Sequence, residues 1–394
     1  MTTAYEAHDT AAALPGATAL LAGYRPGPAT AFFAGPGRTL LAEGVRATVT
    51  DPARATEALR AARAAGAEAP VVVGAIPFSP GRPARLFIPA EVHRAGPLHE
   101  DPLLQLPAAA PATADWRQRP VPAPEVYRDA VAEAVRRLSD DSGLTKVVLA
   151  RTLELTAPGG ADLPAMLHRL SRRDLDGYTF AVPAGGAATL VGASPELLVS
   201  RRATAVSANP LAGSAARSTD LAEDVRRAAA LLESPKDLHE HAVVVEAVRA
   251  ALAPLCAQLH VPERPTLVRT AAMWHLSTTV TGTLADPATS ALDLALALHP
   301  TPAVCGTPTD RARDLIGELE PFDRGLYTGV VGWGDADGDG EWVVTLRCAE
   351  AEGDLLRLFA GAGVVAASDP AAELAETGAK FRTFLHAVGL EESK

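Results

Sequence analysis

The chain is poor in cysteine and has no long apolar run. Its three cysteines, Cys256, Cys305 and Cys348, are scattered and odd in number, so neither a disulfide framework nor a zinc-binding spacing is visible. No apolar run approaches the roughly 18 residues that a membrane-spanning helix needs. The first residues also lack the basic start of a secretory signal. We therefore expect a cytoplasmic protein without a membrane partner.

Positive charge is scarce as well. The 394 residues include 36 Lys and Arg against 47 Asp and Glu, which gives a formal net charge of −11. No basic stripe is visible, so we expect no nucleic-acid partner. A small anionic substrate would need a local group of cations or a metal ion, because the overall field opposes it. The composition, with 48% hydrophobic and 21% charged residues, is typical of a globular protein.

Strands and helices are predicted in blocks rather than in strict alternation. Short apolar runs bounded by turn residues indicate strands, and Ser-Pro or Asp-Pro pairs mark helix starts. This order is typical of an α+β fold, in which large antiparallel or mixed sheets pack with helices in layers. The predicted helices cover 52–65, 125–138, 220–232, 235–253 and 370–387, and the predicted strands cover 71–76, 86–88, 145–155, 178–182, 189–192, 197–200, 328–333, 341–348 and 356–361.

Three further expectations concern how these elements connect. The strands over 178–182, 189–192 and 197–200 follow one another closely and predict a meander. The strands over 328–333 and 341–348 flank a polar turn and predict a hairpin. Residues 106–124 are dense in Pro and Ala and predict a connection that runs over the surface.

Two predicted helices each carry a pair of acidic residues. One helix carries Asp237 and Glu240, and the other carries Glu373 and Glu376. A spacing of three residues puts both members of a pair on one helix face. If the two faces meet, four carboxylates converge in a way that suits Mg²⁺. Two ordinary interpretations stay open, because Asp237 can complete a helix-capping box and Glu376 can form a surface ion pair four residues along its helix.

Lys146 and Glu196 stand at the starts of two predicted strands. Lys146 begins a run that otherwise has the pattern of a buried strand. It either extends its ammonium group to solvent from the strand end or points into a cleft and serves as a base. Glu196 follows Ser194-Pro195, where an exposed position at a strand edge is the ordinary interpretation. The two segments alone leave these alternatives open.

Ten short motifs occur in a fixed order: Lys146–Arg151, Gly192–Glu196, Pro210–Ser214, Ser234–His241, Trp274–Ser277, His299–Ala303, Glu318–Arg324, Gly340–Arg347, Gly361–Gly363 and Glu376–Lys380. Together they resemble the chorismate-binding family, which includes isochorismate, anthranilate, aminodeoxychorismate and salicylate synthases. The resemblance runs from about residue 125 to 390. It implies that residues 116–394 are the chorismate-binding catalytic core and that 1–115 are a divergent N-terminal part of the same fold.

The resemblance implies a metal ion and an acid–base pair. Glu240 and Glu376 resemble the direct Mg²⁺ ligands of the family, with Asp237 and Glu373 holding metal-bound water, and the ion would hold the ring carboxylate of chorismate. In members that add water, the residue at the position of Lys146 activates the water. The residue at the position of Glu196 protonates the C4 hydroxyl as it leaves.

The resemblance also implies a set of substrate-binding residues. Arg347 and Lys380 are similar to the groups that hold the enolpyruvyl carboxylate, and the planar fork of an arginine suits such a contact. His275 resembles a pocket histidine near the departing hydroxyl. The full implied set is Gly213, Ser214, His275, Ala303, Arg347, Gly361 and Lys380.

The nucleophile separates the chemistries of the family. Anthranilate synthases use ammonia and lack the water-activating lysine, so Lys146 argues against that activity. Aminodeoxychorismate synthases place a nucleophilic lysine where this chain has Ala212. Salicylate synthases keep the water-activating lysine and then eliminate pyruvate, so they remain possible. The segments 299–303 and 340–347 look more like dedicated isochorismate synthases. Within those, the segment 340–348 most resembles the siderophore type, which feeds 2,3-dihydroxybenzoate, with the menaquinone type second.

The resemblance therefore implies an enzyme that isomerises chorismate to isochorismate with Mg²⁺, by adding water at C2 and removing the C4 hydroxyl. The alternative outside catalysis is an inactive relative that only binds chorismate. Loss of Lys146, Glu196, Glu240 or Glu376 would favour that alternative, and all four are present. We expect chorismate as the small-molecule partner, and a monomer.

Overall fold

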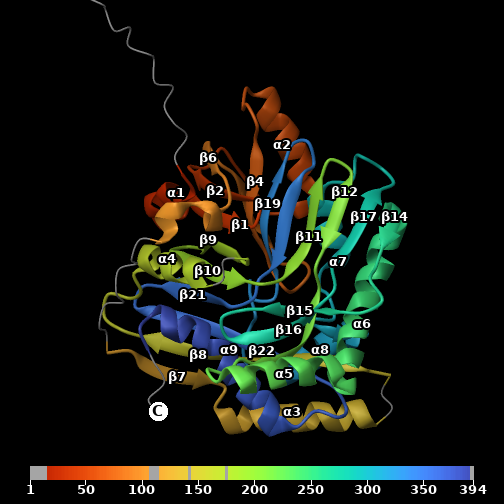
Figure 1. Cartoon of the computed structure of the whole chain (residues 1–394). Helices are drawn as coiled ribbons and strands as arrows, with labels where there is room; N and C mark the ends of the chain where they lie inside the picture. Colours follow the sequence, from red (N-terminus) through yellow and green to blue (C-terminus); the bar gives the residue numbers. More distant parts are fainter. Residues whose placement is uncertain (1–15, 106–114, 141–142, 174–175, 391–394) are drawn as a thin grey trace, which may run out of the picture.

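The computed structural model describes residues 16–105, 115–140, 143–173 and 176–390, and these form a layered α+β structure (Figure 1). Two large sheets pack face to face, helices cover their outer faces, and a small third sheet lies beside them with two more helices. The fold class expected from the sequence is confirmed. Every strand pair among the described residues is antiparallel.

The first large sheet has ten strands and carries one side of the functional site. Its N-terminal strands β1, β2 and β6 continue the part formed by later strands, so residues 16–105 are built into the same sheet. In spatial order the strands are β18 (Gly306–Thr307), β8 (Lys146–Thr156), β22 (Leu355–Val364), β21 (Cys348–Glu352), β10 (Ala188–Ser194), β9 (Tyr178–Gly185), β1 (Thr30–Gly35), β2 (Arg38–Glu43) and β6 (Glu91–Ala95), with β7 (Arg117–Val121) paired to β8.

The second large sheet has nine strands, and the third sheet has three. The N-terminal part again supplies three strands to the large sheet, and the boundary expected at residues 115 and 116 stays a prediction. The second sheet is ordered β14 (Cys256–His260), β17 (Val280–Leu284), β12 (Ala205–Ala208), β11 (Leu197–Arg202), β20 (Gly340–Val344), β19 (Val330–Asp335), β4 (Val71–Ile76), β5 (Arg85–Ile88) and β3 (Ala47–Val49), and the third is β13 (Leu211–Ala216), β16 (Met273–Ser277) and β15 (Thr266–Arg269).

The space between the two large sheets holds a hydrophobic core that includes Phe33 and Val73. Their chain neighbours Phe32 and Val72 point the other way, into the cores under the outer helices, because successive side chains of a strand alternate between its faces. All six residues of β4 are therefore buried. Burial on both faces explains why the sequence shows a continuous apolar run there and no alternation.

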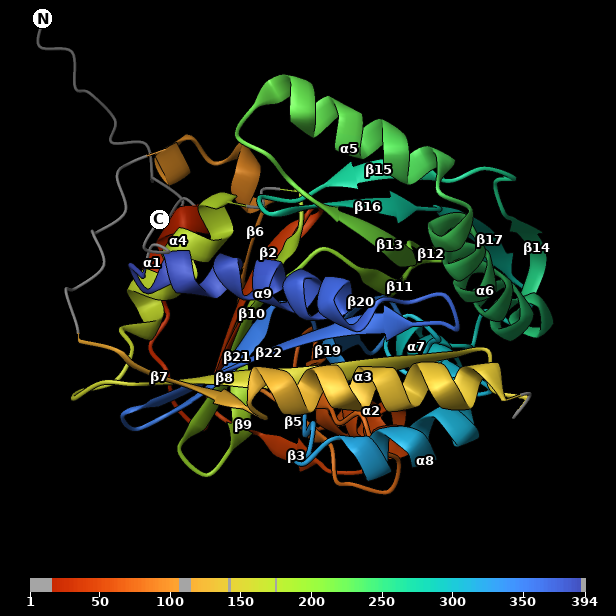
Figure 2. The same cartoon turned by 90° about the horizontal axis from the view of Figure 1, so that it is seen from below.

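The helices lie mainly on the outside of the two large sheets (Figures 1 and 2). Figure 2 shows α9 between α3 and the small sheet, and α9 contacts both. None of the described helices has both the length and the apolar character needed to cross a membrane. The helices are α1 (Ala17–Gly23), α2 (Ala55–Ala64), α3 (Pro124–Ser139), α4 (Leu163–Arg173), α5 (Leu221–Glu233), α6 (Pro235–Leu252), α7 (Ala291–Leu298), α8 (Thr309–Leu319) and α9 (Pro370–Ala387).

The five helices predicted from the sequence are confirmed, and side-chain caps mark the starts of several of them. Ser234 caps α6 by accepting a hydrogen bond from the Asp237 amide at 3.3 Å. Asp369 caps α9 in the same way, with the Ala372 amide at 2.8 Å. The first turn of the helix predicted over 52–65 is a 3₁₀ turn, and α2 follows it. The sequence did not indicate α1, α4, α7 or α8.

The expected meander is wrong in its third strand. Strands β9 and β10 pair with each other, but β11 belongs to the second sheet and pairs with β12 and β20. The strand predicted over 341–348 is also divided, because β20 ends at Val344 and Cys348 begins β21 in the first sheet. Its hairpin with β19 is confirmed. At both crossings the chain passes from one sheet to the other, and the crossings carry Glu196 and Arg347.

The surface connection expected over 106–124 is only partly described, since 106–114 lie outside the described residues. Its later part is not a loop, because β7 pairs with the outer end of β8. Pro120 is tolerated there because β7 is an edge strand, where one face of the backbone needs no partner strand.

Candidate active site

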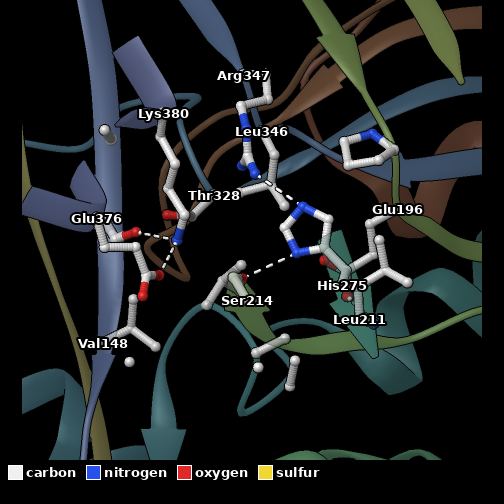
Figure 3. Close-up of a pocket in the computed structure, with 18 of the residues that line it drawn as sticks. Val148, Glu196, Leu211, Ser214, His275, Thr328, Leu346, Arg347, Glu376 and Lys380 are labelled. Atoms are coloured by element: carbon white, nitrogen blue, oxygen red, sulfur yellow. Dashed lines mark hydrogen bonds and ion pairs between the residues drawn. The ribbon is translucent and has the colours of Figure 1, made fainter. Parts of the chain in front are cut away.

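A cavity lies where β8 and β22 of the first sheet meet the small sheet and helices α6 and α9 (Figure 3). Its lining includes most of the residues implied by the sequence. Lys146 and Glu373 do not line it and lie directly behind residues that do. The predicted residues on the lining are Glu196, Gly213, Ser214, Asp237, Glu240, His275, Ala303, Arg347, Gly361, Glu376 and Lys380.

One side of the cavity, here named the charged wall, is built on β8, α6 and α9. It combines three lysines with four carboxylates, and each lysine contacts one glutamate. Two of the ion pairs join different elements, β8 to α6 and α6 to α9, and so help to hold the strand and the two helices together. The charged wall consists of Lys146, Lys236, Asp237, Glu240, Glu373, Glu376 and Lys380.

Lys146 and Glu240 form the most buried of these pairs. Lys146 Nζ lies 2.9 Å from Glu240 Oε1, and the lysine is 1% exposed. Burial by itself would raise the pKa of Glu240, but the charge and hydrogen bond of Lys146 and the charge of Lys236 hold this pKa below its usual value. The lysine therefore does not extend to solvent from the strand end. Its partner Glu240 lines the cavity, so Nζ lies directly behind the cavity lining, and the role of Lys146 as a base stays a prediction.

The other two lysines pair with the carboxylates of α9. Lys236 Nζ, on α6, lies 2.9 Å from Glu373 Oε1. Lys380 Nζ donates to Glu376 Oε1 at 2.6 Å and to the Gly361 carbonyl of β22 at 2.7 Å, as Figure 3 shows for the pair on α9. The pair between Glu376 and Lys380 considered from the sequence is thus present, but it lines the cavity and does not lie on an exposed surface.

The four carboxylates of the charged wall lie close enough to repel one another. Burial raises the pKa of Asp237, and the charges of Glu240 and Glu376 raise it further. Burial also raises the pKa of Glu373, and the charge of Glu376 adds to that effect. A cation between the helices would relieve this repulsion, so the residues fit a hard divalent ion that prefers oxygen ligands.

The present arrangement is not itself a coordination shell. Within the described ranges of the chain, no group of three or more His, Cys, Asp or Glu side chains is disposed to hold a metal ion. Three of the four carboxylates give an oxygen to a lysine instead. The sequence prediction of Mg²⁺ at Glu240, Glu376, Asp237 and Glu373 therefore stays a prediction.

The other side of the cavity, here named the histidine wall, consists of Glu196, Ser214, His275 and Arg347. Ser214 lies on β13 and His275 on β16, and these strands pair. Glu196 and Arg347 come from the two crossings between the large sheets. Figure 3 shows Arg347 and Ser214 on either side of the imidazole ring of His275.

Glu196 is buried and has no ion-pair partner within 4 Å among the described residues. It is 2% exposed, and its Oε1 accepts one weak hydrogen bond, from the Leu211 amide at 3.4 Å. Burial raises the pKa of Glu196 to about 7, although that amide and the charges of Lys146 and Arg347 act in the opposite direction. The carboxyl group therefore carries a proton through part of the neutral range. A buried acid with such a pKa suits proton donation to a substrate.

His275 is held in one tautomer by its two neighbours. Arg347 Nη2 lies 3.1 Å from Nε2, and Ser214 Oγ lies 2.9 Å from Nδ1. Because a guanidinium can only donate, Nε2 must accept, and the ring proton is on Nδ1 and faces the serine. Burial, and then the charge of Arg347, hold the pKa of His275 well below its usual value. The imidazole is neutral and orients the arginine.

Several residues that line the cavity have positive φ angles. Arg347 has φ of 43° and Thr328 has φ of 57°, a left-handed region that non-glycine residues rarely adopt. Both residues line the cavity. Gly213 has φ of 76° and its Cα faces Asp237, where an added Cβ would lie 3.0 Å from the Asp237 Cβ. The backbone is thus held in conformations that serve the cavity lining.

Two glycines of β22 leave room for the charged wall. A Cβ added at Gly363 would lie 2.3 Å from Glu240 Oε1 and 3.1 Å from Lys146 Cε. A Cβ at Gly361 would lie 2.8 Å from Tyr327 Oη. The sequence reasoning placed Gly361 in the site, and it quoted Gly363 in a motif without assigning it a role.

The sequence reasoning also missed Lys236, and a signal for it exists. The chain has four lysines among its 36 basic residues, and three of them, Lys146, Lys236 and Lys380, belong to the charged wall. In a chain that otherwise uses arginine, a retained lysine indicates a place where a compact cation is needed. Further lining residues without an assigned role are Val148, Tyr327, Thr328, Leu346 and Phe359.

Comparison with known sequences gives a consistent result. Residues 99–389 match the family described as "Chorismate binding enzyme". The chain is 51% identical to isochorismate synthase DhbC of Bacillus subtilis (strain 168) over 391 residues, which cover 94% of this chain and 96% of that protein. It is 43% identical to the vibriobactin-specific isochorismate synthase of Vibrio cholerae, over 86% of this chain and 84% of that protein.

A solved structure has the same fold. It is that of a protein from Bacillus anthracis titled a putative 2,3-dihydroxybenzoate-specific isochorismate synthase, DhbC. It superposes with a TM-score of 0.89 at 48% sequence identity, and the match covers 95% of this chain and all of that chain. The resemblance noted from ten motifs therefore extends over nearly the whole chain, including most of the N-terminal part.

Proposed function

The chain belongs to the family of chorismate-binding enzymes, and we propose that it is an isochorismate synthase. Water adds at C2 of chorismate, and the C4 hydroxyl leaves as water after receiving a proton. The observation that carries the proposal is that Glu196 lines the cavity while Lys146, also buried, lies directly behind Glu240 of the charged wall. Lys146 supplies a base and Glu196 supplies a carboxylic acid.

Glu196 is the proposed acid, because burial raises its pKa to about 7 and thus leaves it a proton to donate. Lys146 is the proposed base, and Nζ accepts the proton that water loses as its oxygen attacks C2. This role requires Nζ first to release the proton that it holds in the ion pair and then to exchange its contact with Glu240 Oε1, at 2.9 Å, for a water molecule. After one turnover the base holds a proton and the acid has lost one, and solvent exchange restores both.

The remaining cavity residues are proposed to hold and orient chorismate. Arg347 and Lys380 provide the positive charge for the enolpyruvyl carboxylate, and the neutral His275 fixes the guanidinium at 3.1 Å. Mg²⁺, when bound through Glu240 and Glu376 with water held by Asp237 and Glu373, supplies a positive centre for the ring carboxylate. Local cations of this kind overcome the unfavourable net charge of −11.

Water is the proposed nucleophile because no lysine stands at the position from which aminodeoxychorismate synthases attack the ring. Ala212 lines the cavity at the position where aminodeoxychorismate synthases carry a nucleophilic lysine. The siderophore route is the proposed use of the product, since two of the similar proteins are named for 2,3-dihydroxybenzoate or for a siderophore.

The test is to incubate the purified protein with chorismate and Mg²⁺, without ammonia, and to follow the products by proton NMR. We expect isochorismate at equilibrium with chorismate, and no conversion after a chelator removes the metal. Salicylate with pyruvate as the main products would assign a salicylate synthase instead. Binding of chorismate without any product would identify an inactive relative.

A further inference from the structure

The edge of β8 next to the cavity has a gap in its strand pairing. On one side β8 pairs with β22 along the whole of residues 147–156. On the other side β18 pairs with Lys146 and Val147, and β7 pairs with residues 152–156. Within the described parts of the chain, no strand pairs with residues 148–151 on that side. Buried backbone groups in such a gap need other partners.

Two side chains, Glu320 and Arg324, fill most of this gap. The Ala150 amide donates to Glu320 Oε1 at 2.7 Å, and Arg324 Nη2 donates to the Val148 carbonyl at 2.7 Å. The Val148 amide itself donates to the Cys305 carbonyl at 2.8 Å. A carboxylate acceptor and a guanidinium donor thus replace the carbonyl and the amide that a neighbouring strand would supply.

The same pair reaches the loop on the other side of the gap. Arg324 Nη1 donates to the Val304 carbonyl at 2.7 Å, and Arg324 Nε and Nη2 bind Glu320 at 2.8 and 2.5 Å. The side chains of Glu320 and Arg324 are 3% and 2% exposed. Arg324 also stacks over Phe78, with its Cζ 4.6 Å from the ring centroid. The pair is therefore fixed from several sides and is screened from solvent.

The segments that this pair joins both form the cavity. Val148 lines it, and Lys146 precedes Val148 by two residues on the same strand. Ala303 and Val304 line it from the loop. A buried ion pair contributes little net stability compared with apolar residues of the same size, so stability alone is a weak reason to have one here. Fixing two backbone segments with charge-assisted hydrogen bonds requires these particular groups.

We propose that Glu320 and Arg324 are positioning residues for catalysis. They take the place of a strand beside β8 and hold the strand that carries Lys146 against the loop that carries Ala303. Neither residue lines the cavity itself, so their effect on the reaction passes through the residues they bond, which are the backbone of Val148, Ala150 and Val304 and the hydroxyl of Thr328. The inference rests on the proposed function, in which Lys146 must lie at a defined place relative to C2 of chorismate.

The test compares E320Q and R324K with E154Q. Gln at 320 keeps an oxygen for the Ala150 amide but loses the charge that holds the guanidinium. Lys at 324 keeps the charge but loses the planar fork. Glu154 is the matched control, since it is a buried glutamate on the same strand, bound to Arg357 at 3.2 Å and to Arg119, and it does not line the cavity.

We expect kcat of E320Q and R324K to fall about 10-fold to 100-fold, the size of effect that a small displacement of a reacting group causes. KM for chorismate should stay within about threefold, because Arg347 and Lys380 are not moved. E154Q should keep the kcat of the unchanged protein, even if it loses as much thermal stability. The proposal would be overturned if E154Q lost as much kcat as E320Q and R324K at the same loss of thermal stability. It would also be overturned if folded E320Q kept the kcat of the unchanged protein.

Amide hydrogen exchange separates this inference from the proposed function. In E320Q the amides of 148–150 and of 303–305 should exchange faster than in the unchanged protein, while those of β21 keep their rates. If the unchanged protein does not convert chorismate, the proposed function fails and the exchange data still decide whether the pair fixes the two segments. Unchanged exchange at these amides would reject the positioning role, whatever the activity.

Discussion

Glu196 and Glu240 line the same cavity and both are almost fully buried, yet their pKa values move in opposite directions. Burial disfavours the charged form of each carboxyl group. On the charged wall, Lys146 and Lys236 outweigh that effect, and the pKa of Glu240 falls. On the histidine wall, the Leu211 amide and more distant cations do not outweigh it, and the pKa of Glu196 rises to about 7.

The comparison shows that the distance to a cation, and not the degree of burial, decides which carboxyl group keeps its proton. The charged wall offers ionised oxygens that suit a cation, and the histidine wall offers an acid. Both roles occur in one small cavity because β8, α6 and α9 bring lysines to one side only. Variants that remove one partner at a time should therefore act differently on the two walls.

The largest effect is expected for Lys146→Met. We expect kcat to fall by about 1,000-fold, within the range for loss of a general base, and Glu240 is left buried without its counter-ion. Breaking a buried pair in this way costs about 3–5 kcal/mol of unfolding free energy. Product formation and chemical denaturation measure the two effects.

Lys146→Gln separates the two effects, because an amide still donates to Glu240 but cannot accept a proton. Its stability should lie well above that of Lys146→Met while its kcat stays equally low. A Gln variant with kcat near that of the unchanged protein would remove Lys146 from the role of base.

The next largest effect is expected for Glu196→Gln on the other wall. Loss of the acid should lower kcat about 100-fold. In the unchanged protein, kcat should fall as the pH rises through about 7, because Glu196 then loses its proton. The variant should lack this part of the pH profile, since its amide does not titrate. If the variant keeps the same decline near pH 7, another group is responsible for it.

Stability should change with pH in a way that depends on Glu196. Its pKa is raised from 4.5 to about 7, so the folded state binds the proton more tightly than the unfolded state. The folded protein therefore loses stability as the pH rises from 4.5 to about 7, by up to about 3 kcal/mol for this group. Glu196→Gln should be as stable as the unchanged protein near pH 5 and more stable at pH 8, as measured by urea unfolding. Equal stabilities at pH 8 would contradict the assigned pKa.

The sequence predicts well what is decided locally. Helix α9 begins and ends where its capping residues predict, and α6 begins at Pro235 after Ser234. The spacing of Asp237 and Glu240 put both on one face of α6. Local signals do not tell which sheet a strand joins, because β11 and β21 carry no residue pattern that names their neighbours. Each lies inside its sheet with a partner on both sides, so its placement depends on pairing with strands distant in the sequence.

The site was predictable only as a set of residues. Motif order brought Lys146, Glu196 and Glu240 together, but the contact between Lys146 and Glu240 depends on how β8 meets α6, which no spacing encodes. The raised pKa of Glu196 depends on the lack of a close cation, which is a property of the folded cavity. The role of Glu320 depends on a gap in strand pairing, and such a gap has no sequence signature.

The smallest effect is expected for Gly363→Ala, which tests how closely the charged wall is packed. Its Cβ would lie 2.3 Å from Glu240 Oε1 and 3.1 Å from Lys146 Cε, so the ion pair must shift. We expect the free energy of unfolding to fall by about 1–3 kcal/mol from overpacking, and kcat to fall about 10-fold.

Gly317→Ala in α8 is the control, since nothing lies within 4 Å of its added Cβ and alanine favours helix by about 0.5–1 kcal/mol. A Gly363→Ala protein as stable and active as the Gly317→Ala protein would mean that Glu240 and Lys146 can separate freely. The difference between the two walls would then not depend on their contact.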